Sequence, residues 1–156
     1  MSIRFSGIII FILLTIFILA CGNNKHSKVD SEQNNSEIHA HQIADSISGM
    51  QLNDGQKWLM DEHTRSSFKK MASTFSASDH SSIEGLQGVG VELRGQVNEL
   101  LKGCTMDGAA HDQLHVFMMG YIPAVDSLSS SNNLELGQEQ AIKVKEYLDA
   151  YSVYFE

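Results

Sequence analysis

The sequence predicts an all-α protein whose folded domain is an antiparallel up-and-down bundle of four helices. Apolar residues recur every three or four positions through most of the chain after residue 50, which is the spacing of one helix face. No segment alternates between apolar and polar residues over the length of a strand. Proline occurs once in 156 residues, at Pro123. These patterns favour helices joined by short loops over a sandwich of short strands.

Two helices are expected in the first half of this domain. The first spans about residues 54–75, with Asn53 or Asp54 as its cap. The second spans about residues 83–102 and ends at Gly103. Glycines inside the second helix each destabilise it by up to about 1 kcal/mol relative to alanine, so its first half is expected to be irregular. The predicted apolar faces hold Met60, Thr64, Phe68, Met71 and Phe75 in the first helix, and Ile83, Leu86, Gly90, Leu93, Val97, Leu100 and Leu101 in the second.

Two further helices are expected in the second half. The third spans about residues 107–128, and Pro123 is expected to kink it or to end its first segment. A loop at residues 129–133 leads to the fourth helix, at about residues 136–154. Their apolar faces hold Ala110, Leu114, Phe117, Tyr121, Val125 and Leu128, and then Ala141, Val144, Leu148, Tyr151 and Phe155.

Residues 1–20 have the layout of a signal peptide. A short first stretch carries Arg4, and residues 8–20 are almost wholly apolar. This apolar run of about 13 residues is near 20 Å long as a helix, whereas a membrane span needs about 20 residues. We therefore expect an export signal and not a permanent membrane anchor.

The segment Ile18-Leu19-Ala20-Cys21 resembles the lipobox of bacterial lipoproteins, in which signal peptidase II cleaves before the cysteine. The resemblance implies a thioether-linked diacylglycerol on Cys21 and an acyl group on its new amino terminus. Several acyl chains together hold a protein stably on a membrane. Gly22, and not aspartate, follows the cysteine, which by resemblance to the sorting rule of enteric bacteria favours the outer membrane over the inner membrane. The expected location is the cell envelope.

A polar stretch separates this cysteine from the bundle. Residues 22–46 are too poor in apolar side chains to bury a core, so residues 21–49 are interpreted as a lipid-anchored flexible tether and residues 50–156 as the bundle domain. His39 and His41 lie in the tether and are interpreted as solvated side chains, although the pair could take up a metal weakly. The formal net charge is -8, and the absence of a basic face argues against a nucleic-acid partner.

Soft and borderline metal ligands cluster between the second and third helices. At 100° per residue, His111, His115 and Met118 lie within about 60° of one another on the third helix. Cys104 and Met106 precede that helix and could fold over its first turn. Thiolate, thioether and imidazole groups suit copper better than magnesium or calcium. These five residues are the candidate metal ligands.

Cys104 is the lone thiol of the mature chain if Cys21 is acylated. An unpaired cysteine in an oxidising compartment is explained by burial, by intermolecular pairing or by a metal. The alternative interpretation is that Cys104 and Met118 pack in the core while His111 and His115 are ordinary polar residues at its rim.

Catalytic interpretations are less well supported, and we expect no enzyme activity. His111-Asp-Gln-Leu-His115 resembles the zincin motif, but aspartate replaces the glutamate that acts as general base, and no third ligand follows. A nucleophilic pairing of Cys104 with either histidine lacks a recognisable orienting residue. The chain has no C-x-x-C-H motif for covalent haem. Non-covalent haem between bundle helices stays open, with a methionine and a histidine as axial ligands.

The stretches LNDGQKW (residues 52–58) and CTM-x-G-x-x-H-x-x-LH (residues 104–115) resemble a group of small uncharacterised helical bacterial lipoproteins, and this resemblance implies no activity. The expected function is that of a lipid-anchored envelope protein whose bundle binds a ligand, with a soft metal such as copper as the sharper hypothesis. The alternative is a structural or protein-interaction lipoprotein that meets an envelope partner and binds no metal.

Overall fold

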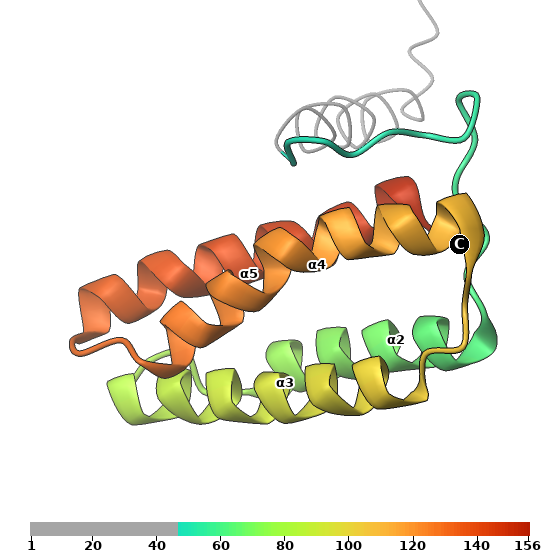
Figure 1. Cartoon of the computed structure of the whole chain (residues 1–156). Helices are drawn as coiled ribbons and strands as arrows, with labels where there is room; N and C mark the ends of the chain where they lie inside the picture. The colour runs from blue at the N-terminus through green and yellow to red at the C-terminus, as the bar shows by residue number, and fades with distance from the viewer. Residues whose placement is uncertain (1–46) are drawn as a thin grey trace, which may run out of the picture.

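The computed structural model describes residues 47–156, which form a bundle of helices (Figure 1). Its helices are α2 (Glu62–Ala77), α3 (Ile83–Gly103), α4 (Gly108–Ser129) and α5 (Leu134–Tyr154). Helices α2 and α3 lie side by side in one layer, and α4 and α5 in the other (Figure 1). Helices next to each other in sequence pack antiparallel, so the predicted all-α four-helix bundle is confirmed. The predicted signal peptide, the lipidation site Cys21 and the tether up to residue 46 lie outside the described residues.

The core is rich in aromatic side chains from three helices. Phe117 of α4 is fully buried and meets Phe68 of α2 edge-on, with ring centroids 5.5 Å apart. Tyr151 of α5 stacks on Phe68 at 3.9 Å. Burial of these rings removes a large apolar area from water and fixes the helices against one another.

None of the helices between residues 47 and 156 is both long and apolar enough to cross a membrane.

The first helix begins at Glu62, so the prediction that it starts near Asp54 under an Asn53 or Asp54 cap is wrong. The carboxylate of Asp61 accepts a hydrogen bond from the Thr64 backbone N–H at 2.7 Å and caps the helix instead. Asp54 has a φ of 51°, in the left-handed region, which a right-handed helix cannot contain. Asn53 and Gln56 exchange backbone hydrogen bonds across this turn.

Residues 47–60, called here the N-terminal strap, run along the bundle before α2 begins and are non-helical, with turns at residues 48–49 and 54–55. Ile47 is buried, and the Gln51 N–H donates to the Gln113 side chain of α4 at 2.9 Å. Near α2 the strap pairs with the last residues of the chain: Trp58 N–H donates to the Tyr154 carbonyl at 2.8 Å and Glu156 N–H donates to the Trp58 carbonyl at 3.0 Å. The strap therefore covers the bundle on the side of α4 and α5.

Contrary to expectation, the glycines of α3 and Pro123 of α4 do not interrupt their helices. Helix α3 is continuous from Ile83, so the predicted irregular first half is wrong. Gly90 is needed there for close approach, because a Cβ atom at this position would collide with the backbone of Ser129 at the end of α4. Helix α4 continues through Pro123 to Ser129, so Pro123 does not end it.

Helix α5 begins at Leu134, two residues before the expected start, because the Asn133 side chain accepts a hydrogen bond from Leu136 N–H at 3.0 Å and caps the helix there.

Candidate functional site

A small cavity lies between the C-terminal end of α3 and the first half of α4. Its volume is about 240 Å³. Four of the five predicted metal ligands line it, together with leucine side chains from both helices. The lining residues are Leu100, Leu101, Cys104, His111, Leu114, His115 and Met118. The cavity, called here the His–Cys cavity, thus brings together imidazole, thiol and thioether groups between apolar walls.

The two histidines of the cavity face each other. Their Nε2 atoms lie 3.0 Å apart, and their rings meet edge-on with centroids separated by 4.4 Å. His111 is half-buried and His115 is exposed, so the pair lies at the mouth of the cavity. A hydrogen bond between two imidazole nitrogens requires that one carries a proton and the other does not. The same geometry offers two nitrogen lone pairs to one metal ion once both facing nitrogens are deprotonated.

The separation of the two nitrogens determines the angle that they would subtend at a bound ion. With a metal–nitrogen bond of about 2.0–2.1 Å, a gap of 3.0 Å corresponds to a nitrogen–metal–nitrogen angle of about 91–97°. That angle is the one between neighbouring positions of a square-planar or tetragonal site. A tetrahedral ion would require the two nitrogens about 3.3 Å apart, which is a small side-chain movement away.

The two sulfur atoms differ in burial. Cys104 follows the last residue of α3, where it serves as the C-cap, and its thiol is free and half-buried. Met118 is only 4% exposed and lies one turn beyond His115 on α4. Because His111, His115 and Met118 obey the helical spacing, the predicted stripe on α4 does face the cavity.

Met106 does not join this group. It lies in the loop between α3 and α4, and its sulfur accepts a hydrogen bond from the Thr64 hydroxyl of α2 at 3.5 Å. It packs against the core beside α2 and is not among the side chains that line the His–Cys cavity. Four of the five predicted residues therefore line the His–Cys cavity, whereas Met106 lies apart from them.

Sequence reasoning missed His63, which lies on α2 close to the same end of α3. One of its ring nitrogens is 3.3 Å from the Leu100 carbonyl oxygen. Carbonyls in the last turn of a helix lack partners within that helix, so this contact satisfies one of them. Among residues 47–156, no three histidine, cysteine, aspartate or glutamate side chains come together as a metal-binding group, so Cys104 does not complete such a group with the histidine pair in this arrangement.

The cavity does not fit a haem. Its volume of about 240 Å³ is below the ~300–1,000 Å³ of sites that enclose drug-sized ligands. His111, His115 and Met118 all lie on one helix, so they cannot reach opposite faces of a macrocycle as axial ligands.

No protein family, no curated protein and no solved structure matches this chain.

Proposed function

We propose that the bundle is a copper-binding domain, with His111 and His115 as its nitrogen ligands and Cys104 and Met118 as its sulfur ligands. The observation that carries this proposal is the pair of imidazole nitrogens 3.0 Å apart at the mouth of a cavity that a thiol and a thioether also line. Imidazole suits copper in both oxidation states, and soft sulfur ligands favour Cu(I).

The composition of the cavity supports copper over harder cations. No carboxylate lines it, whereas calcium and magnesium bind mainly through oxygen ligands. The angle of about 91–97° available to the histidine pair fits neighbouring positions of a tetragonal Cu(II) site. The proposed role is binding, and no catalytic step is assigned to this site.

The proposal includes delivery of this domain to the cell envelope. Lipid on Cys21 would hold it to a membrane, with the outer membrane favoured over the inner one, and residues up to 46 would act as a spacer. The support is the sequence pattern of residues 1–21. We expect wild-type protein and Cys104→Ser to incorporate labelled fatty acid and Cys21→Ser not to; label on Cys21→Ser would refute the assignment.

The copper proposal is tested by competition between the full-length protein and a chromogenic Cu(I) chelator, and by electron paramagnetic resonance of the Cu(II) form. We expect one copper ion per chain and hyperfine coupling to two nitrogens. His111→Ala and His115→Ala should each remove one coupled nitrogen and weaken binding by at least tenfold. Both side chains reach the surface, so neither substitution creates a buried cavity.

Controls separate this site from three other histidines of the chain. All titrations are repeated with His39→Ala and His41→Ala present, because these two residues could bind copper by themselves. His80→Ala is the matched control, since this imidazole lies outside the His–Cys cavity. If His111→Ala with Cys104→Ser leaves copper affinity unchanged, the proposal is wrong and a protein-interaction role is the better explanation.

A further inference from the structure

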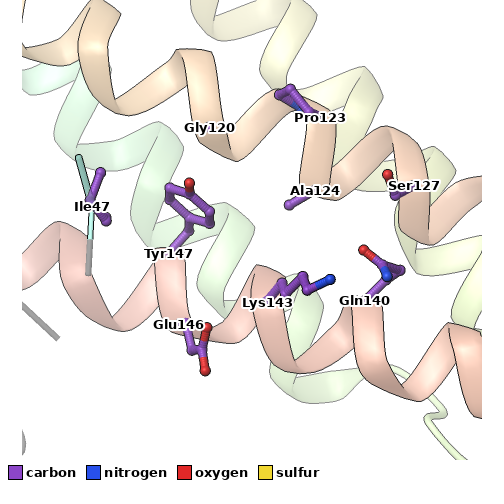
Figure 2. A pocket seen from close by; sticks show the side chains of 9 residues that line it. All are labelled: Ile47, Gly120, Pro123, Ala124, Ser127, Gln140, Lys143, Glu146 and Tyr147. Atoms are coloured by element: carbon purple, nitrogen blue, oxygen red, sulfur yellow. The ribbon is translucent and has the colours of Figure 1, made fainter. Parts of the chain in front are cut away.

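We propose that a second cavity, between α4 and α5, binds a small organic monocarboxylate with a short alkyl body. This cavity, called here the α4–α5 cavity, has a volume of about 370 Å³ (Figure 2). That volume is within the ~300–1,000 Å³ of small-molecule sites. It is separate from the His–Cys cavity because its residues on α4, such as Gly120 and Ser127, lie on the helix face opposite His111.

The floor of the α4–α5 cavity is apolar and is built by specific contacts. Ala124 and Pro123 supply it from α4, and buried Ile47 of the N-terminal strap adds to its wall. Tyr147 of α5 lays its hydroxyl against the α4 backbone at Gly120, where any side chain would collide with it. An alkyl chain would lose water contact against this surface, which is favourable.

The polar groups around this floor include the hydrogen-bond donors of Tyr147, Gln140 and Lys143, beside the carboxylate of Glu146. Tyr147 and Gln140 extend from α5 toward α4, with Lys143 between them, whereas Glu146 points away from α4 (Figure 2). Ammonium, amide and hydroxyl groups together match a ligand end that carries several acceptor atoms. A carboxylate has acceptor oxygens only, and it also complements the charge of Lys143.

Lys143 can leave its present ion-pair partner, Glu139, and pair with a ligand carboxylate. Its ammonium pairs with the Glu139 carboxylate at 2.9 Å, and both side chains are about half exposed, at 49% and 57%. Exposed ion pairs within one helix are weak, so a ligand carboxylate held by the cavity can replace Glu139. Since the chain as a whole is acidic, attraction of an anion must come from this local group.

Binding is tested by isothermal titration calorimetry on the full-length protein in lipid nanodiscs, with empty nanodiscs as the blank. The probes are hexanoate and its neutral analogue hexanol. We expect hexanoate to bind more tightly than hexanol, and Lys143→Met to weaken hexanoate by about fivefold. Glu139→Gln should strengthen hexanoate binding, because it frees Lys143. Ser127→Phe, which fills an exposed edge of the cavity, should abolish binding of both probes.

Lys145→Met is the matched control. Lys145 is two residues further along α5, pairs with Asp149 at 2.6 Å, and lines a different cavity. It should leave hexanoate affinity unchanged. The proposal is overturned if hexanoate does not bind, if hexanol binds equally well, or if Lys143→Met and Lys145→Met have the same effect. Circular dichroism of each variant shows whether the bundle remains folded.

Discussion

Phe117 holds the aromatic core together, and its removal should destabilise the domain severely. Its ring is fully buried and meets four other rings edge-on, with centroid distances from 5.5 to 6.1 Å, those of Phe68, Tyr147, Tyr151 and Phe155. Phe→Ala substitutions in a core cost about 3–5 kcal/mol. Because edge-to-face pairs add to the burial term, we expect Phe117→Ala to lose about 4 kcal/mol. A domain of this size has only about 5–15 kcal/mol in total.

Urea unfolding and thermal melting measure this loss. The folded domain has roughly 110 residues, so about 4 kcal/mol corresponds to a fall of about 15 °C in the melting temperature. Met119→Ala is the control on the same helix, because Met119 is 77% exposed and should change stability by no more than about 0.5 kcal/mol. A loss below about 1.5 kcal/mol for Phe117→Ala would show that these rings do not form one tightly packed cluster.

Four further substitutions test local features of the fold. Asp61→Ala removes the cap of α2 and should cost about 1 kcal/mol in urea unfolding; no change would mean that Thr64 N–H finds another partner. Gly90→Ala should destabilise the folded domain by about 1–3 kcal/mol, although alanine has the better helix propensity, because the new Cβ atom would meet Ser129. Gly88→Ala should stabilise the domain by about 0.5–1 kcal/mol, because its Cβ atom would meet nothing within 4 Å. If both variants shift the melting temperature in the same direction, the close approach of α3 and α4 is wrong. Hydrogen bonds from Ser81 and Ser82 lower the pKa of Asp79 from 3.8 to about 2. This carboxylate therefore stabilises the folded state above about pH 4, and the contribution disappears as the pH falls toward 2. The stability difference between wild type and Asp79→Asn should shrink over that range, and a constant difference in denaturation midpoints would contradict the assignment.

The helix faces could be predicted from the sequence because buried positions follow the helical period. Phe68, Met71 and Phe75 were predicted on the apolar face of the first helix, and all three are buried. Met60 was predicted on the same face and is buried too, but from the N-terminal strap. Apolar spacing does not distinguish a helical turn from an extended segment that packs on the same core. The Asp54–Gly55 pair, a dipeptide typical of turns, is the sequence feature that marks this segment as non-helical.

The arrangement of the candidate site residues on helix α4 could be predicted from the sequence, whereas the position of the loop residue Met106 could not. His111, His115 and Met118 share a face because their spacing is fixed by the helix. Met106 has no such constraint, and its contact with Thr64 depends on how the loop returns from α3 to α4. The α4–α5 cavity could not be predicted, since Ile47, Gly120 and Lys143 have no common pattern in sequence and meet only after the helices pack.

The pairing of the N-terminal strap with residues 154–156 joins the beginning and the end of the described sequence into one cooperative unit. Met60 N–H donates to the Glu156 carbonyl at 2.7 Å, across 96 positions of sequence (156 − 60). Release of the end of α5 therefore exposes the strap, and release of the strap frees that end of α5. Native-state hydrogen exchange should give the amides of Trp58, Met60 and Glu156 the same opening free energy, although they lie at opposite ends of the folded sequence.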